Sequence, residues 1–200
     1  MIIHFVCRGN AFRSIIAEAY LNSLELKDWA VLSSGTAAAS EKARNLASYG
    51  KTLELLEEHG IRGFAKPGYG DQLTQPRLER ADVTVCMNQR VYDECLRFVT
   101  FRASPRIWSV ADIGEPGRIS DAESERRIYR EEAYREIAGN VDWLISDLDA
   151  CLIALTDPNH GSCSQARSGR RRPSRVDDLV RRVGTGGHAD QRQQCGGHRR

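Results

Sequence analysis

The N-terminal segment constrains the fold more than any other part of the sequence. Residues 2–6 form an apolar run that stops at Cys7, and Gly9 and Asn10 follow at once. Such a run is typical of a strand buried on both faces of a parallel sheet, and Gly and Asn tolerate left-handed backbone in a tight loop. Apolar residues then recur at helical spacing over residues 15–24. The segment therefore predicts a strand, a loop and a helix, in that order.

The same alternation recurs along the chain. Three further short apolar runs predict strands, and two stretches predict helices between them. The predicted strands are residues 29–32, 83–87 and 107–110, and the predicted helices are residues 52–59 and 90–98. Strands that alternate with helices imply right-handed crossovers between parallel strands. We therefore expect an α/β fold with an open, mostly four-stranded parallel sheet and helices on both faces, of the Rossmann-like type.

A long helical pattern follows Asp121, which can serve as an N-cap. Its apolar positions lie three to five residues apart and end before Asp157, whose following proline stops a helix. These positions are Ile128, Ala133, Ile137, Val141, Leu144, Leu148, Leu152 and Leu155. The pattern predicts one long helix, or two helices broken at Gly139 and Asn140, against one face of the sheet.

The charge of the chain changes where this pattern ends. Residues 1–156 carry 19 Lys and Arg against 23 Asp and Glu, a net charge of −4, and residues 157–200 carry 10 Arg against 4 Asp, a net charge of +6. The second segment has no Phe, Tyr, Trp, Ile, Met or Lys, so it cannot bury enough apolar surface to offset the entropy of ordering. We expect a domain over residues 1–156 and a basic, disordered tail over residues 157–200. Basic arms can bind nucleic acid, but without aromatic side chains to stack on bases an extension with no partner is the favoured interpretation.

Composition excludes several classes of protein. No apolar run approaches the roughly 20 residues that a membrane span needs. The six cysteines form no C-x-x-C pair, and His residues do not cluster with them. We therefore expect a cytoplasmic protein with reduced thiols, no membrane contact, no structural metal and no cofactor.

Cys7 and Arg13 stand in the pattern C-x5-R, and their place between a strand and a helix gives this common pattern its meaning. There the backbone N–H groups of residues 8–13 would curl around one point and bind a tetrahedral oxyanion, supported by the helix dipole. Arg13 would hold two oxygens of the anion, and the Ser14 hydroxyl could donate to the Cys7 sulfur. The same positive field favours the thiolate of Cys7, which would attack phosphorus. The predicted phosphate-binding residues are Arg8, Gly9, Asn10, Ala11, Phe12, Arg13 and Ser14.

This segment resembles the phosphate loop of the low-molecular-weight protein tyrosine phosphatases, which reads roughly V-C-x-G-N-x-x-R-S-x-x-A-E. Residues 6–18 read V-C-R-G-N-A-F-R-S-I-I-A-E, and residues 33–36, 59–61 and 81–87 agree with further parts of the family's pattern. The resemblance covers about residues 1–156. It implies Cys7 as the nucleophile, Arg13 as the phosphate ligand, Asn10 and Ser14 as organisers of the loop, and Ser33 as part of the network that holds Asn10.

The resemblance also implies an aspartic general acid after the fourth strand, which protonates the leaving group and later activates water. Asp112 stands at that place and is the candidate, with Glu115 as the rival; in a third interpretation Asp112 is only a turn residue. The tyrosine pair that often follows the acid in this family is missing from residues 113–117. We therefore expect a phosphomonoesterase that acts on phosphotyrosine in proteins or on small phosphomonoesters, and that is inhibited by phosphate-like oxyanions. Phosphatase chemistry is better supported than tyrosine specificity.

Two other functions use the same kind of loop. In arsenate reduction the thiolate attacks arsenate, and relay thiols, here Cys86 and Cys95, then form a disulfide. Eight residues separate these two cysteines, which is a wide spacing for such a relay. The other alternative is a module that binds an oxyanion without turnover, as would follow if Asp112 did not reach the loop.

Overall fold

The computed structural model describes residues 1–112 and 122–156, with side chains as far as Cys151. Residues Met1–Ile153 make one compact unit, and the fold described below is that of this unit. The predicted tail over residues 157–200 lies outside the described residues, as does the segment that follows Asp112.

Strands and helices alternate along the described chain. In order they are β1 (Ile2–Cys7), α1 (Arg13–Ser23), β2 (Ala30–Gly35), α2 (Lys42–Glu58), the 3₁₀ turn η1 (Arg62–Phe64), α3 (Gln75–Leu78), β3 (Val83–Cys86), α4 (Gln89–Cys95), β4 (Arg106–Ile107) and α5 (Glu123–Thr156). The strands form one sheet in the order β2-β1-β3-β4, and every neighbouring pair is parallel. The predicted α/β class with an open, four-stranded parallel sheet is confirmed.

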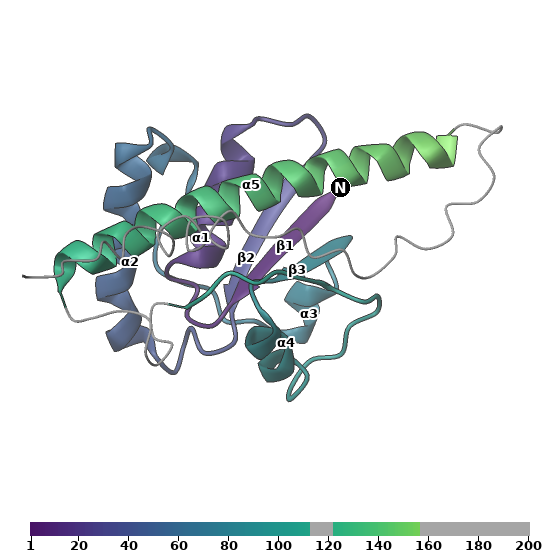
Figure 1. Cartoon of the computed structure of the whole chain (residues 1–200). Helices are drawn as coiled ribbons and strands as arrows, with labels where there is room; N and C mark the ends of the chain where they lie inside the picture. Colours follow the sequence, from purple (N-terminus) through teal and green to yellow (C-terminus); the bar gives the residue numbers. More distant parts are fainter. Residues whose placement is uncertain (113–121, 157–200) are drawn as a thin grey trace, which may run out of the picture. The chain divides into compact units, whose positions relative to one another are not determined.

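The central strand β1 divides the core into two parts because its side chains alternate between the faces of the sheet. Ile3, Phe5 and Cys7 belong to the larger hydrophobic cluster, which includes the buried residues of α1 and α5. Val6 belongs to a second cluster, which is completed by residues from α3, β3 and α4. Helices therefore cover both faces of the sheet, and α5 runs across one of them (Figure 1).

The helix α5 is continuous from Glu123 to Thr156, so the chain does not break at Gly139. Five of the predicted apolar positions are buried in the core: Ala133, Ile137, Val141, Leu144 and Leu148. Ile128, the first position of the predicted face, is 58% exposed, which corrects that part of the pattern. The run of buried apolar positions begins at Ala133, and before it Tyr129 packs against the same core cluster while only partly buried.

The other predicted elements occur with different bounds. β2 runs from Ala30 to Gly35 and so includes the polar residues Ser33 and Ser34. Their backbone pairs with β1, and their side chains form hydrogen bonds with Asn10 and His4. α2 begins at Lys42, ten residues before the predicted start, and its first turns are largely exposed, so they lack the apolar spacing that sequence reasoning detects. The fourth strand is only Arg106–Ile107; beyond it the chain stays beside β3 through isolated backbone hydrogen bonds.

Replacement of Gly139 by Ala tests the continuity of α5. Nothing lies within 4 Å of a Cβ at this exposed helical position, so Gly139→Ala should increase the free energy of unfolding by about 0.5–1 kcal/mol. Urea denaturation followed by circular dichroism measures the change. Gly35→Ala is the contrasting variant and should be destabilised, since a Cβ there would lie 2.5 Å from the carbonyl oxygen of Arg8. Loss of stability in Gly139→Ala would mean that the helix is interrupted at this point.

Candidate active site

The loop after β1 lies at the carboxyl end of the central strand. In the strand order β2-β1-β3-β4, the chain leaves β1 toward β2 on one side and returns to β3 on the other. Parallel α/β sheets bind ligands at such a switch point, in the crevice beyond the carboxyl ends of the strands. Cys7 ends β1 and Arg13 begins α1, so the loop occupies this crevice.

The end of β2 packs directly against the backbone of the loop. Gly35 pairs with Cys7 in the sheet, and a Cβ on Gly35 would lie 2.5 Å from the carbonyl oxygen of Arg8 and 2.7 Å from the amide nitrogen of Asn10. Only glycine permits this approach. The amide of Thr36 donates to the carbonyl oxygen of Cys7 at 3.0 Å, which continues the pairing one residue further.

Asn10 has a positive φ of 46°, and its side chain makes four hydrogen bonds. The amide group donates to Ser14 Oγ at 2.8 Å and to Ser33 Oγ at 2.9 Å. The carbonyl oxygen accepts from Lys66 Nζ at 2.6 Å and from the backbone N–H of Asp71 at 2.7 Å. Every donor and acceptor of the Asn10 side chain is therefore used, which fixes the turn of the loop.

The thiol of Cys7 receives hydrogen bonds at the base of the loop. The backbone N–H of Asn10 donates to Cys7 Sγ at 3.2 Å, and Ser14 Oγ lies 3.0 Å from the sulfur. Because Ser14 Oγ already accepts from Asn10, its own proton is free to point at the sulfur. Donors aimed at sulfur stabilise the thiolate, which is the nucleophilic form of cysteine.

Arg13 and Asp112 meet although 99 residues separate them in the sequence. The guanidinium of Arg13 is 3% exposed, donates to the carbonyl oxygen of Val110 at 3.0 Å, and pairs with Asp112 Oδ2 at 2.6 Å. Asp112 thus lies at the loop, and Glu115, the rival acid, is outside the described residues. A cavity of about 550 Å³ is lined by Cys7, Gly9, Ala11, Phe12, Arg13 and Asp112, together with side chains at its mouth.

Two residues of the loop's support carry no signal in the sequence: Lys66 and Asp71. Lys66 binds Asn10 and also pairs with Asp71 at 2.9 Å, and Arg77 pairs with Asp71 at 3.0 Å. Burial alone would raise the pKa of Asp71, but these two cations hold that pKa below its ordinary value. Glu18, which is 5% exposed, accepts a hydrogen bond from Ser33, and burial raises its pKa. Ser33 is therefore held between Asn10 and Glu18.

The structure does not bring Cys86 and Cys95 to the loop. Both are fully buried in the second hydrophobic cluster, on the face of the sheet opposite to the side chain of Cys7. A hydrogen bond between the two thiols, together with burial, raises the pKa of Cys86 far above its ordinary value. The thiol of Cys86 is therefore in the unreactive, protonated form, and the sheet separates both thiols from Cys7.

Two classes of site are not found in the described part of the chain. No group of three or more His, Cys, Asp or Glu side chains there is placed to hold a metal ion. No helix within residues 1–112 and 122–156 is both long and apolar enough to cross a membrane.

A central β1, a cysteine at its end and an arginine at the start of α1 define a class: α/β phosphatases built on a cysteine-containing phosphate loop. Comparison with protein families agrees, since the family described as low molecular weight phosphotyrosine protein phosphatase matches residues 2–123. The chain belongs to this family of cysteine-dependent phosphatases. The comparison with curated protein sequences gave no match.

Solved structures show the same fold. The Wzb protein of Vibrio vulnificus, solved in complex with benzylphosphonate, is 21% identical over 73% of this chain and 97% of its own, with a TM-score of 0.58. The thioredoxin-dependent arsenate reductase of Corynebacterium glutamicum is 22% identical over 75% of this chain and 62% of its own, with a TM-score of 0.51. The fold is thus shared by proteins with different reactions.

Replacement of Lys66 by Met tests whether the Asn10 network holds the loop. The change removes the hydrogen bond to Asn10 Oδ1 and one of the two cations beside Asp71. Lys66→Met should lose about 1–3 kcal/mol of unfolding free energy and bind inorganic phosphate more weakly, as measured by urea denaturation and by inhibition of turnover. Lys51→Met is the matched control, because Lys51 is half exposed and pairs with Glu54 on the same helix. Equal stability and equal phosphate inhibition in the two variants would contradict the role of Lys66.

Proposed function

We propose that the protein hydrolyses phosphotyrosine in proteins through a cysteinyl-phosphate intermediate. One observation carries the proposal: Cys7 Sγ lies at the base of a cavity, within 3.2 Å of the Asn10 amide and 3.0 Å of Ser14 Oγ, and the same cavity is lined by Arg13 and Asp112. A nucleophile, an anion ligand and a carboxyl group therefore face one space.

In the first step the Cys7 thiolate attacks phosphorus in line with the leaving oxygen. The S–P bond forms as the bond from phosphorus to the tyrosyl oxygen breaks, and protonated Asp112 gives its proton to that oxygen. Arg13 and the backbone N–H groups of residues 8–13 bind the equatorial oxygens, whose charge is greatest in the transition state. To do so, the Arg13 guanidinium exchanges its contact with Asp112 for one with phosphate, which leaves Asp112 free to serve the leaving group.

In the second step water replaces the cysteine. Asp112, now ionised, accepts a proton from the water, the water oxygen attacks phosphorus, and the S–P bond breaks to return the thiolate and release inorganic phosphate. The hydrogen bonds from Asn10 N–H and Ser14 Oγ stabilise the departing sulfur in this step, as they stabilise the attacking sulfur in the first. Phosphate-like oxyanions should compete for the same loop.

A phosphorylated side chain on a protein suits the site in size. The cavity of about 550 Å³ is several times larger than a phosphate group, and Phe12 forms part of its wall beside the loop. The Wzb protein was solved with benzylphosphonate, an aromatic phosphonate. Arsenate reduction is the less favoured function here, because Cys86 and Cys95 lie on the opposite face of the sheet from Cys7.

Two substrates with different leaving groups distinguish the role of the proton donor from the role of the nucleophile. Asp112→Asn should lower kcat/KM for phosphotyrosine peptides, which reports the first step, by about 10²- to 10⁴-fold. It should lower kcat/KM for p-nitrophenyl phosphate much less, since nitrophenolate leaves without a proton, whereas kcat can fall for both substrates because Asp112 also serves the second step. Cys7→Ser should lose turnover of both substrates. Steady-state kinetics with the two substrates measure all three effects.

Glu115→Gln is the matched control for the acid. It should retain wild-type kinetics on both substrates if Asp112 is the proton donor. Equal loss of kcat/KM on both substrates in Asp112→Asn would reduce Asp112 to a binding or turn residue. Loss in Glu115→Gln alone would make Glu115 the acid, and turnover that survives in Cys7→Ser would exclude the cysteinyl-phosphate route.

A further inference from the structure

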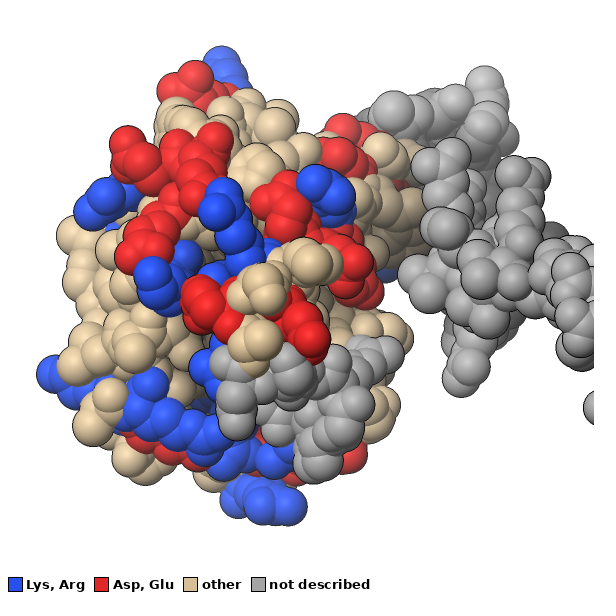
Figure 2. All heavy atoms as spheres, turned by 60° about the vertical axis from the view of Figure 1, so that its left-hand side comes forward, with Lys and Arg blue, Asp and Glu red and all other residues tan. Residues whose placement is uncertain are grey.

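Arginines from four segments line the mouth of the phosphate cavity. They are Arg8 of the loop, Arg44 of α2, Arg90 of α4 and Arg126 of α5. Figure 2 turns forward the side of the molecule that carries α2 and the start of α5, and Lys and Arg side chains lie there among Asp and Glu. Neighbouring carboxylates can neutralise the positive charge of these arginines. The attraction that they exert on an anionic ligand therefore depends on which of them already form ion pairs.

Arg8 is paired twice at the mouth, and Arg90 only weakly. The guanidinium of Arg8 binds Glu41 at 2.6 Å and also contacts Glu94. Arg90 is 58% exposed, and its ion pair is a 3.5 Å contact with Glu94, a carboxylate that already serves Arg8.

Arg44 forms no ion pair with any acid of residues 1–112 or 122–156. It is exposed and lines the same cavity as Cys7. The hydrogen bond from Arg8 lowers the pKa of Glu41 most, and the charge of Arg44 helps to lower it from a longer distance. Arg8, Arg44 and Arg90 lie close to two carboxylates, Glu41 and Glu94, so these five side chains carry a net charge of +1. This charge is separate from Arg13, which lies deeper and is 3% exposed.

We propose that Arg44 and Arg90 bind carboxylates on both sides of the phosphorylated tyrosine, so that the substrates are acidic phosphopeptide segments. The inference rests on the proposed function and names the sequence class that it acts on. The phosphate is bound at the base of the cavity by the loop and Arg13, so charges at the mouth face the residues next to the phosphotyrosine. Arg44 and Arg90 lie at the rim of the cavity. Their long, exposed side chains can bind carboxylates bidentately, and their positive charge attracts a polyanionic segment before it docks.

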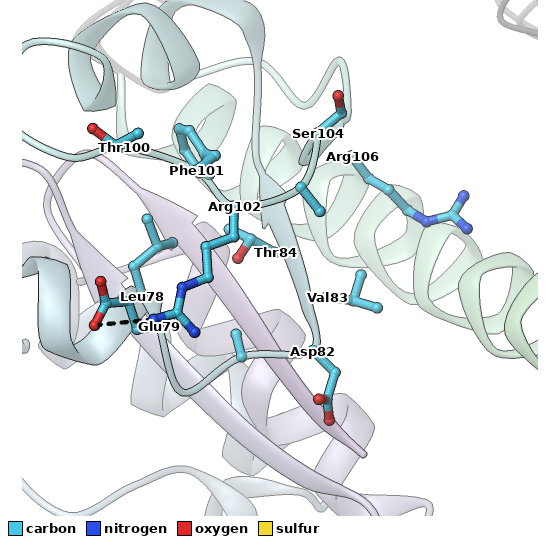
Figure 3. Close-up of a pocket in the computed structure, with 12 residues that line it drawn as sticks. Leu78, Glu79, Asp82, Val83, Thr84, Thr100, Phe101, Arg102, Ser104 and Arg106 are labelled. Carbon is cyan, nitrogen blue, oxygen red and sulfur yellow. Dashed lines mark ion pairs between the residues drawn. The ribbon is translucent and has the colours of Figure 1, made fainter.

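A second hollow of the molecule supplies a control. It has a volume of about 460 Å³ and lies at the start of β3, at the opposite end of that strand from the loop. Figure 3 shows Arg102 there with its guanidinium beside Glu79, which it pairs with at 3.8 Å. Arg102 is exposed, like Arg44 and Arg90, but does not line the phosphate cavity. Its replacement changes the net charge equally and leaves the rim intact.

Peptide kinetics test the proposal on the full chain. The substrates are a phosphotyrosine peptide with Glu on both sides and the same peptide with Gln, and the enzymes are wild type, Arg44→Gln, Arg90→Gln, their double variant and Arg102→Gln. At low salt the wild type should show a kcat/KM about 3- to 20-fold higher for the Glu peptide. This ratio should fall in each single rim variant, approach one in the double variant, and also approach one in high salt. Arg102→Gln should keep the wild-type ratio.

The contrary outcomes are distinct. Equal kcat/KM for the Glu and Gln peptides in the wild type at low salt, or a ratio that persists in the double variant, overturns the inference and leaves the proposed function intact. A ratio that falls equally in Arg102→Gln overturns it too, since net charge rather than the rim would then be responsible. Failure to hydrolyse either peptide, beside turnover of p-nitrophenyl phosphate, overturns tyrosine specificity and the inference together.

Discussion

The hydrogen bonds of the Asn10 side chain are the interaction on which the rest of the site depends. They hold a residue with positive φ at the tip of the turn after β1, where the backbone must reverse before α1 can begin. Their partners come from α1, from β2 and from the segment of residues 66–71. The loop can therefore take its final shape only when these parts of the fold have come together. The same turn aims the Asn10 amide at the Cys7 sulfur.

The parallel sheet brings distant chemistry to one place because the carboxyl ends of its strands share one edge. β1 ends at Cys7, and β2 ends at Gly35, which presses on the loop. The segment after β4 passes Arg13 at Val110 and reaches Asp112. The candidates for nucleophile and anion ligand thus come from one loop, and the acid candidate comes from a segment 99 residues after Arg13.

The charge around the cavity of Cys7 is opposite in sign to the net charge of residues 1–156. Residues 1–156 have a net charge of −4, yet the cavity around Cys7 is lined by arginines at its base and at its mouth. In the proposed mechanism buried Arg13 binds the phosphate, and the exposed arginines face the residues around it. A segment of negative net charge can attract an anionic substrate in this way, because the local field inside a cleft outweighs a net charge spread over the surface. The overall charge of +2 for the chain describes neither residues 1–156 nor residues 157–200.

Sequence alone determined the strand, loop and helix at the N-terminus, the parallel α/β class and most of the buried face of α5. It also identified Cys7, Arg13 and Ser14 as candidates, because they belong to one contiguous motif, whereas Asp112 became a candidate through the resemblance to the phosphatase family. Lys66 and Asp71 escaped detection since they lie 56 and 61 residues from Asn10 and meet it only through the fold. Tertiary structure alone decided that Cys86 faces away from Cys7 and that Arg44 and Arg90 share a rim. Strand order and the side of the sheet set those distances, and neither is encoded in the spacing of residues along the chain.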